Sequence, residues 1–145
     1  MAAFDPHLAL EHRRLDTLCQ QLEAIADALP DAVPPRLCSD VTAAMHSLLC
    51  APGRRTAALL GAKAYTLSGL KPFHLEEEAL AQDLAEPVAQ MASGSVPANP
   101  EMTGYMLRCL FSSLRRTVWI ETLLQPQIRP LMRPRPGLTV VPDRG

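Results

Sequence analysis

The pattern of apolar and polar positions predicts a chain built from helices. Apolar residues recur at alternating steps of three and four positions in four segments, residues 6–29, 35–50, 73–92 and 104–132. This spacing places them on one face of a helix, which is then buried against its neighbours. Short turns rich in proline and glycine separate the segments. We therefore expect an all-α fold, arranged as an up-down-up-down four-helix bundle.

The stretch before the third of these helices has a weaker pattern. Residues 54–70 permit a helix, but Gly61 and Gly69 weaken it, and Pro72 prevents a continuous helix from running into the next segment. We expect the third helix to be interrupted near Pro72.

The last helical segment carries polar residues within its apolar stripe. The stripe consists of Met106, Leu110, Leu114, Thr117, Glu121, Leu124 and Ile128. An unpaired carboxylate in a protein core is costly, so Glu121 must meet a cation, a hydrogen-bond donor or a metal, or keep its proton. We therefore expect Glu121 to be buried and to have such a partner inside the fold.

Each of the first three segments also carries a histidine. His12 lies at the edge of the first apolar stripe, His46 on the polar side of the second, and His74 on the alanine side of the third. A lone histidine in such a position is more often a hydrogen-bonded boundary residue than a ligand. The run of glutamates at 76–78 stands near a helix start, where negative charge stabilises the helix through its interaction with the helix dipole. This effect alone can account for the run. A fold that brought the three histidines to Glu121 would nevertheless make a polar centre.

Composition limits the remaining classes of function. The chain has 145 residues, 48% of them hydrophobic, and a net charge of -1. We expect one domain over residues 1–132, followed by an irregular tail rich in proline and arginine at 133–145.

The near-neutral charge gives no support to a nucleic-acid partner. The four cysteines form no C-x-x-C pair, and neither a secretory signal nor an apolar run long enough for a membrane is present. We expect a cytoplasmic protein without a membrane or nucleic-acid partner.

Three stretches together resemble a known family, the bacterial hemerythrin-like (HHE cation-binding) proteins. The stretch ANPEMTGYMLRCLFSSLRRTVWIETLLQPQIRPLM is similar to the last helix of that family, where an Arg-Arg-His segment is followed by a Glu four residues after the His. Here Arg115, Arg116 and Glu121 match, and Thr117 occupies the His position. FDPHLALEHRRLDTLCQQLEAIADAL resembles the first helix, and FHLEEEALAQDL the third. The resemblance covers residues 4–137 and is weak from 36 to 70.

The resemblance implies a set of metal ligands. The family has a His on the first and third helices and a His–Glu pair, four residues apart, on the second and fourth. The matching positions here are His12, His46, His74 and Glu121, which we take as candidate metal ligands. The resemblance thus implies that Glu121 is buried beside His12 or His74, and that without a metal it bonds to one of these imidazoles or to Thr117. Cys50 stands where the second helix should have Glu, so two of the six family ligands are altered. Another register, which we rank lower, pairs His74 with Glu78. Whether Cys50, Glu77 or Glu78 replaces a missing ligand stays open.

Two hypotheses for function follow from this resemblance. The first, which the altered ligands favour, is a metal-poor or metal-free helical scaffold that works through a protein partner or a second copy of itself. The alternative is a non-haem iron protein that stores or senses iron, dioxygen or nitric oxide. Its iron would be mononuclear or substoichiometric, held by His12, His74 and Glu121 with or without His46. Neither a G-x-S-x-G motif nor a phosphate loop is present, so we do not expect an enzyme.

Overall fold

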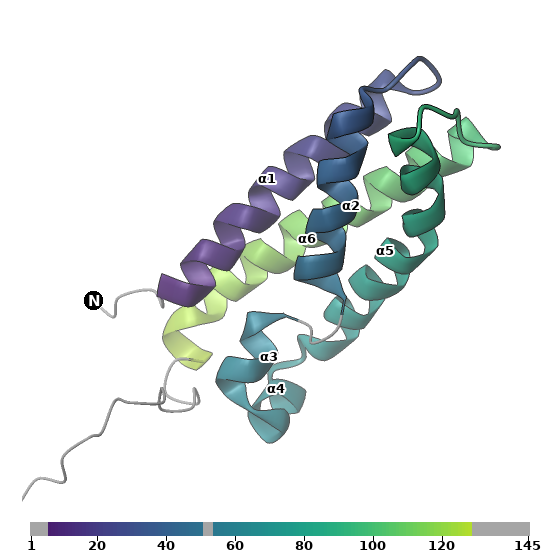
Figure 1. Cartoon of the computed structure of the whole chain (residues 1–145). Helices are drawn as coiled ribbons and strands as arrows, with labels where there is room; N and C mark the ends of the chain where they lie inside the picture. Colours follow the sequence, from purple (N-terminus) through teal and green to yellow (C-terminus); the bar gives the residue numbers. More distant parts are fainter. Residues whose placement is uncertain (1–5, 51–53, 129–145) are drawn as a thin grey trace, which may run out of the picture.

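The computed structural model describes residues 6–50 and 54–128, and all regular structure in these ranges is helical. Six helices follow one another along the chain: α1 (Pro6–Ala28), α2 (Pro35–Leu49), α3 (Arg55–Leu60), α4 (Ala62–Ser68), α5 (Lys71–Ala92) and α6 (Pro100–Ile128) (Figure 1). The expectation of an all-α protein is confirmed. The predicted tail at 133–145 lies outside the described residues.

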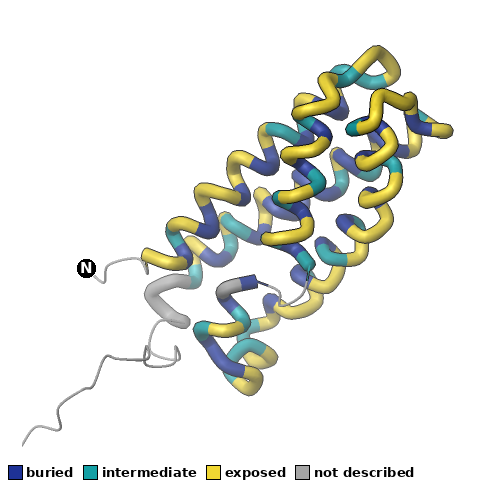
Figure 2. Tube along the Cα trace, in the orientation of Figure 1, coloured by how far each residue is buried: buried dark blue, intermediate teal, exposed yellow. Residues whose placement is uncertain are grey.

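Four long helices make up most of the molecule. Helix α1 packs against α6 and α2, and α5 packs against α2 and α6, so that each long helix touches two others. The short helices α3 and α4 lie together at one end, next to α1 and α5 (Figure 1). Buried positions on the long helices face one another, and exposed positions face outward (Figure 2). The core between them is aliphatic, with leucines from α1, α5 and α6 at its centre.

Local sequence explains where the helices begin and end. Pro35 opens α2, where its missing N–H is not needed. Helix α3 stops at Gly61 and α4 at Gly69, both with positive φ angles of 79° and 76°, which favour glycine. Helix α5 then begins at Lys71, with Pro72 in its first turn. The predicted interruption near Pro72 is therefore present, and residues 54–70 form two short helices where we expected one weak segment.

The mixed stripe of the last helix points into the core as predicted. Leu110, Leu114, Thr117 and Glu121 are all 0% exposed, while Met106 and Leu124 are partly buried. The side chain of Ile128 is not among those that the structure describes. None of the described helices is both long enough and apolar enough to cross a membrane.

Candidate functional site

A cluster of buried polar side chains lies at the end of the molecule where α3 and α4 join the long helices. We call it the Arg54 cluster, and it consists of Glu11, His12, Arg54, His74, Glu77, Thr117 and Glu121. These residues come from α1, α5 and α6 and from the position just before α3. Each is less than 10% exposed. Polar groups buried to this extent need partners, and the structure provides them.

Arg54 links the three glutamates of the cluster. Its Nε donates to Oε1 of Glu11 at 2.7 Å, and one terminal nitrogen donates to Oε1 of Glu77 at 2.7 Å. The other terminal nitrogen lies 3.3 Å from Oε1 of Glu121 and 3.5 Å from its Oε2. The planar guanidinium therefore uses all three of its nitrogens on carboxylates from three different helices.

Glu121 also receives hydrogen bonds from two histidines. Nε2 of His12 lies 2.5 Å from its Oε2, and Nε2 of His74 lies 2.8 Å from its Oε1. A carboxylate can only accept, so we assign an N–H to Nε2 of each imidazole. The expectation that Glu121 is buried and bonded to these histidines is confirmed.

Tyr65 of α4 extends this chain of hydrogen bonds toward the surface. Its hydroxyl lies 2.5 Å from Nδ1 of His74, and the two rings stack with centroids 5.4 Å apart. Burial raises the pKa of the Tyr65 phenol to about 12, more than the nearby charge of Arg54 lowers it. The phenol therefore keeps its proton and donates to His74, which in turn donates to Glu121.

Glu77 is held by two hydroxyl groups of α6. Oγ1 of Thr117 donates to its Oε2 at 2.5 Å, and Oγ of Ser113 donates to the same oxygen at 3.2 Å. Ser113, Thr117 and Glu121 follow one another at intervals of four, which places them on one face of α6. Thr117 thus bonds to Glu77, not to Glu121 as we had considered.

The electrostatics of the cluster favour ionised glutamate and charged arginine. Burial alone would raise the pKa of Glu121, but the hydrogen bonds from His12 and His74 and the charge of Arg54 outweigh it and lower the pKa to about 2. Burial likewise acts against the charge of Arg54, and the charges of Glu121, Glu77 and Glu11 overcome it, so the pKa of Arg54 is raised. Glu121 and Arg54 therefore form a buried ion pair at neutral pH.

Three of the four candidate ligands meet, and the fourth does not. His12, His74 and Glu121 are in direct contact, whereas His46 is exposed on the outer side of α2. His46 therefore lies apart from the other three in this structure. Its position opposite the apolar face of α2 keeps it in solvent, as its place on the polar side of the pattern indicated. Cys50, at the end of α2, is partly buried with a free thiol.

Sequence reasoning missed the residue at the centre of the cluster. Arg54 stands just before α3 and belongs to no periodic stripe, so nothing in its sequence context distinguishes it from a surface arginine. Glu11 was overlooked as well, although it lies between Leu8 and Leu15 on the apolar face of α1 and could have been found there. Tyr65 carried no comparable signal.

The residues present do not fit a di-iron centre. Such a centre needs carboxylates that are free to bridge two cations, and here the carboxylates of Glu11, Glu77 and Glu121 already bind Arg54. Among the residues that the structure describes, no group of three or more His, Cys, Asp or Glu side chains is arranged to hold a metal ion. A single ion held by His12, His74 and Glu121 would require both Nε2 protons to leave.

Comparison with models of known protein families, with curated proteins and with solved structures finds no match for this chain.

Proposed function

We propose that this chain is a hemerythrin-like up-down-up-down four-helix bundle in which Arg54 takes the place of a metal, and that it works as a metal-free helical interaction protein. The observation that carries the proposal is the guanidinium of Arg54, which lies within 3.5 Å of carboxylate oxygens from Glu11, Glu77 and Glu121. The order of contacts among α1, α2, α5 and α6 supports the bundle.

The charge of Arg54 is the main obstacle to a metal. At about 5 Å and an effective dielectric constant of about 20, a guanidinium and a divalent ion repel each other by about 7 kcal/mol. This repulsion lowers metal affinity by roughly five powers of ten. Glutamates that would otherwise attract a cation are already neutralised in part by Arg54. The cluster is therefore complete as a structural element without a metal.

The decisive measurement is metal content together with a variant that removes the guanidinium. Wild-type protein purified from iron-replete cells should carry far less than one iron atom per chain, and added Fe²⁺ or Zn²⁺ should leave its melting temperature unchanged. Arg54→Met should be less stable, because three carboxylates lose their cation, and should regain stability when metal is added. Arg108→Met, which removes an exposed arginine of α6, is the matched control.

Two outcomes would contradict the proposal. One is stoichiometric iron in the wild type. The other is an equal metal-dependent rise of melting temperature in wild type and Arg54→Met, which would show that the guanidinium does not oppose the ion.

A second candidate function is a mononuclear non-haem iron protein for iron, dioxygen or nitric oxide, and one observation favours it. Two imidazole nitrogens converge on a single carboxylate, from His12 at 2.5 Å and His74 at 2.8 Å, and two histidines with one carboxylate suit iron. This function predicts one iron per chain in the wild type and loss of that iron in His74→Ala, with helical content retained.

A further inference from the structure

Helix α6 carries a second stripe, on the side opposite the core. The outer stripe consists of Met102, Tyr105, Cys109, Ser112, Arg116, Trp119 and Leu123, at alternating steps of three and four. Its large apolar members are strongly exposed, Tyr105 at 67% and Trp119 at 64%. Steps of three and four are the spacing by which one helix packs along another. Met102 and Leu123 are exposed as well, whereas Cys109 is partly buried and the guanidinium of Arg116 lies over the ring of Phe73.

The outer stripe is similar when read in either direction, except that Cys109 on one side of the centre corresponds to Arg116 on the other. Met102 and Leu123 stand at its two ends, Tyr105 and Trp119 come next, and the small Ser112 is at the centre. A second copy of α6 laid antiparallel about a two-fold axis at Ser112 would place aliphatic opposite aliphatic and aromatic opposite aromatic. Such self-complementarity is what a two-fold symmetric interface requires.

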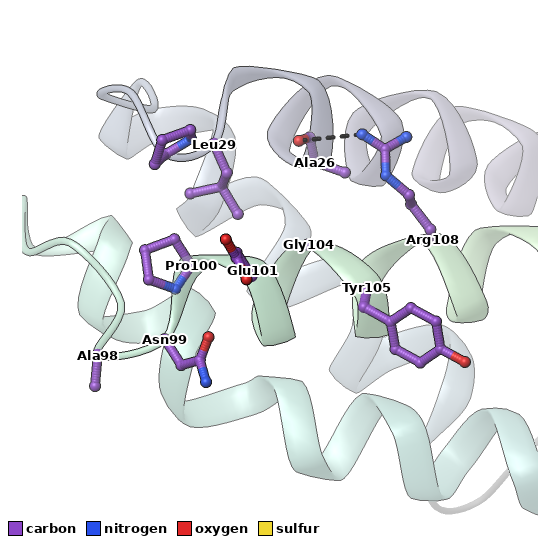
Figure 3. Close-up of a pocket in the computed structure, with 10 residues that line it drawn as sticks. Ala26, Leu29, Ala98, Asn99, Pro100, Glu101, Gly104, Tyr105 and Arg108 are labelled. Atoms are coloured by element: carbon purple, nitrogen blue, oxygen red, sulfur yellow. Dashed lines mark hydrogen bonds between the residues drawn. The ribbon is translucent and has the colours of Figure 1, made fainter.

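A groove beside Tyr105 supplies a receiving site. It has a volume of about 620 Å³ and is lined on α6 by Pro100, Glu101, Gly104, Tyr105 and Arg108 (Figure 3). The last four of these positions have the spacing of the hole that accepts a side chain from a facing helix. The opposite wall comes from the end of α1 and the turn after it.

Gly104 makes this hole deep. It lies inside α6, where glycine costs about 1 kcal/mol relative to alanine. A Cβ built at this position would meet nothing within 4 Å, so no neighbour in the fold requires glycine here. The missing side chain instead leaves open space between Glu101 and Arg108, in the floor of the groove (Figure 3).

We propose that α6 is the interface of a homodimer in which Trp119 of each copy enters the groove at Gly104 of the other. Trp119 lies seven residues after Ser112. The middle of the hole, between Gly104 and Tyr105, lies seven to eight residues before Ser112. The two-fold axis at Ser112 therefore brings the two together. Arg108, held by the carbonyl of Ala26 and by Asp27, presents its guanidinium at the rim, where an indole ring is a favourable neighbour.

The exposed area indicates a reversible dimer. With roughly 200 Å² for a large aromatic side chain, the exposed two-thirds of Tyr105 and Trp119 from both copies amount to about 500 Å². Specific stable interfaces bury at least ~1,200 Å² in total, so these four side chains supply nearly half of the smallest such area. Met102, Leu123 and the groove walls add to it. We expect a dissociation constant in the micromolar range. The proposal does not depend on what the Arg54 cluster holds.

The only tryptophan of the chain reports directly on this interface. On dilution of the full chain, Trp119 fluorescence should shift to the red as sedimentation velocity shows dimer giving way to monomer. Trp119→Ala and Gly104→Leu should each weaken dimerisation at least tenfold. A Cβ at Gly104 would meet nothing within 4 Å, and a helix favours leucine over glycine, so we expect Gly104→Leu to keep the fold while it fills the hole. Circular dichroism of the variant checks that the helices are retained. Leu75→Ala, which trims an exposed leucine of α5, is the control and should not change dimerisation.

Three results would overturn the proposal. A wild type that stays monomeric up to about 1 mM has no such interface. A dimer that forms equally well in Trp119→Ala and Gly104→Leu uses another surface. A monomer that dimerises only after residues 129–145 are removed would show that the chain's own C-terminal segment occupies the outer stripe. None of these results bears on the metal content, so the two proposals fail separately.

Discussion

Replacing Glu121 with glutamine tests how much the Arg54 cluster contributes to stability. Glu121 is 0% exposed and accepts hydrogen bonds from His12 and His74 while facing the guanidinium of Arg54. Glu11 and Glu77 share the same arginine. Glutamine keeps the size of the side chain, removes its charge and replaces one accepting oxygen with an NH2 group, which would face N–H donors of a histidine and of Arg54. The change therefore removes the ionic and hydrogen-bonding contribution of the carboxylate while the packing volume stays nearly the same.

The magnitude follows from the pKa of the carboxyl group. Folding lowers the pKa of Glu121 from 4.5 to about 2. This difference corresponds to about 3 kcal/mol of stability, which is a large fraction of the free energy of unfolding of a domain this size. Because the folded pKa lies below the unfolded one, the contribution is complete above about pH 4.5 and disappears as the pH falls toward about 2.

Urea unfolding followed by circular dichroism, repeated from neutral to acidic pH, measures both the size and the window of this effect. Near neutral pH, Glu121→Gln should lose about 3 kcal/mol, or roughly 10 °C in melting temperature. The gap between wild type and variant should close as the pH falls through the window of about 4.5 to about 2. Glu23→Gln is the matched control, because Glu23 pairs with Arg115 on the surface, and such pairs contribute at most about 1 kcal/mol.

The reasoning is refuted if Glu121→Gln is as stable as Glu23→Gln near neutral pH. It is also refuted if the stability gap to wild type stays constant from neutral to acidic conditions, since a charge-independent loss of packing would behave that way.

Two further predictions concern single buried groups. Replacing threonine with valine should change the free energy of unfolding in opposite directions at two buried sites. Thr117→Val should lower it by about 1–2 kcal/mol, because Glu77 loses a hydrogen-bond donor. Thr56→Val should raise it by about 1 kcal/mol, because the buried Thr56 hydroxyl has no hydrogen-bond partner within the described structure. Equal signs in urea unfolding would contradict this. Burial raises the pKa of the Cys19 thiol to about 12, so a thiol reagent near neutral pH should modify Cys109 well before Cys19 in the native protein, as peptide mapping by mass spectrometry can establish.

Helix periodicity was sufficient to predict the four long helices and the burial of Glu121, but not the division of residues 54–70 into α3 and α4. Each long helix has its apolar positions at steps of three and four, and that regularity depends only on residues near one another in the chain. The stripe through Leu114, Thr117 and Glu121 turned out to be fully buried. A carboxylate in such a stripe needs a donor, and the family resemblance indicated the histidines at 12 and 74.

The centre of the site could not be predicted in the same way. Arg54 bonds to residues 43, 23 and 67 positions away, so its partners are defined only when the helices have docked. An arginine outside a periodic segment is normally exposed, and no local rule identifies the exception. His46 shows the reverse case: the family resemblance drew it into the site, although its place on the polar face of α2 already indicated solvent.

The shared guanidinium of Arg54 also constrains how this sequence can change over evolutionary time. Because Glu11, Glu77 and Glu121 depend on the same cation, loss of Arg54 leaves three buried carboxylates uncompensated, and loss of any one glutamate weakens the environment of the arginine. A fully apolar interior can be as stable as an ionic one, but every path to it by single substitutions passes through less stable intermediates. Sequence drift should therefore be slowest at these four positions, and a change at one should be accompanied by changes at the others.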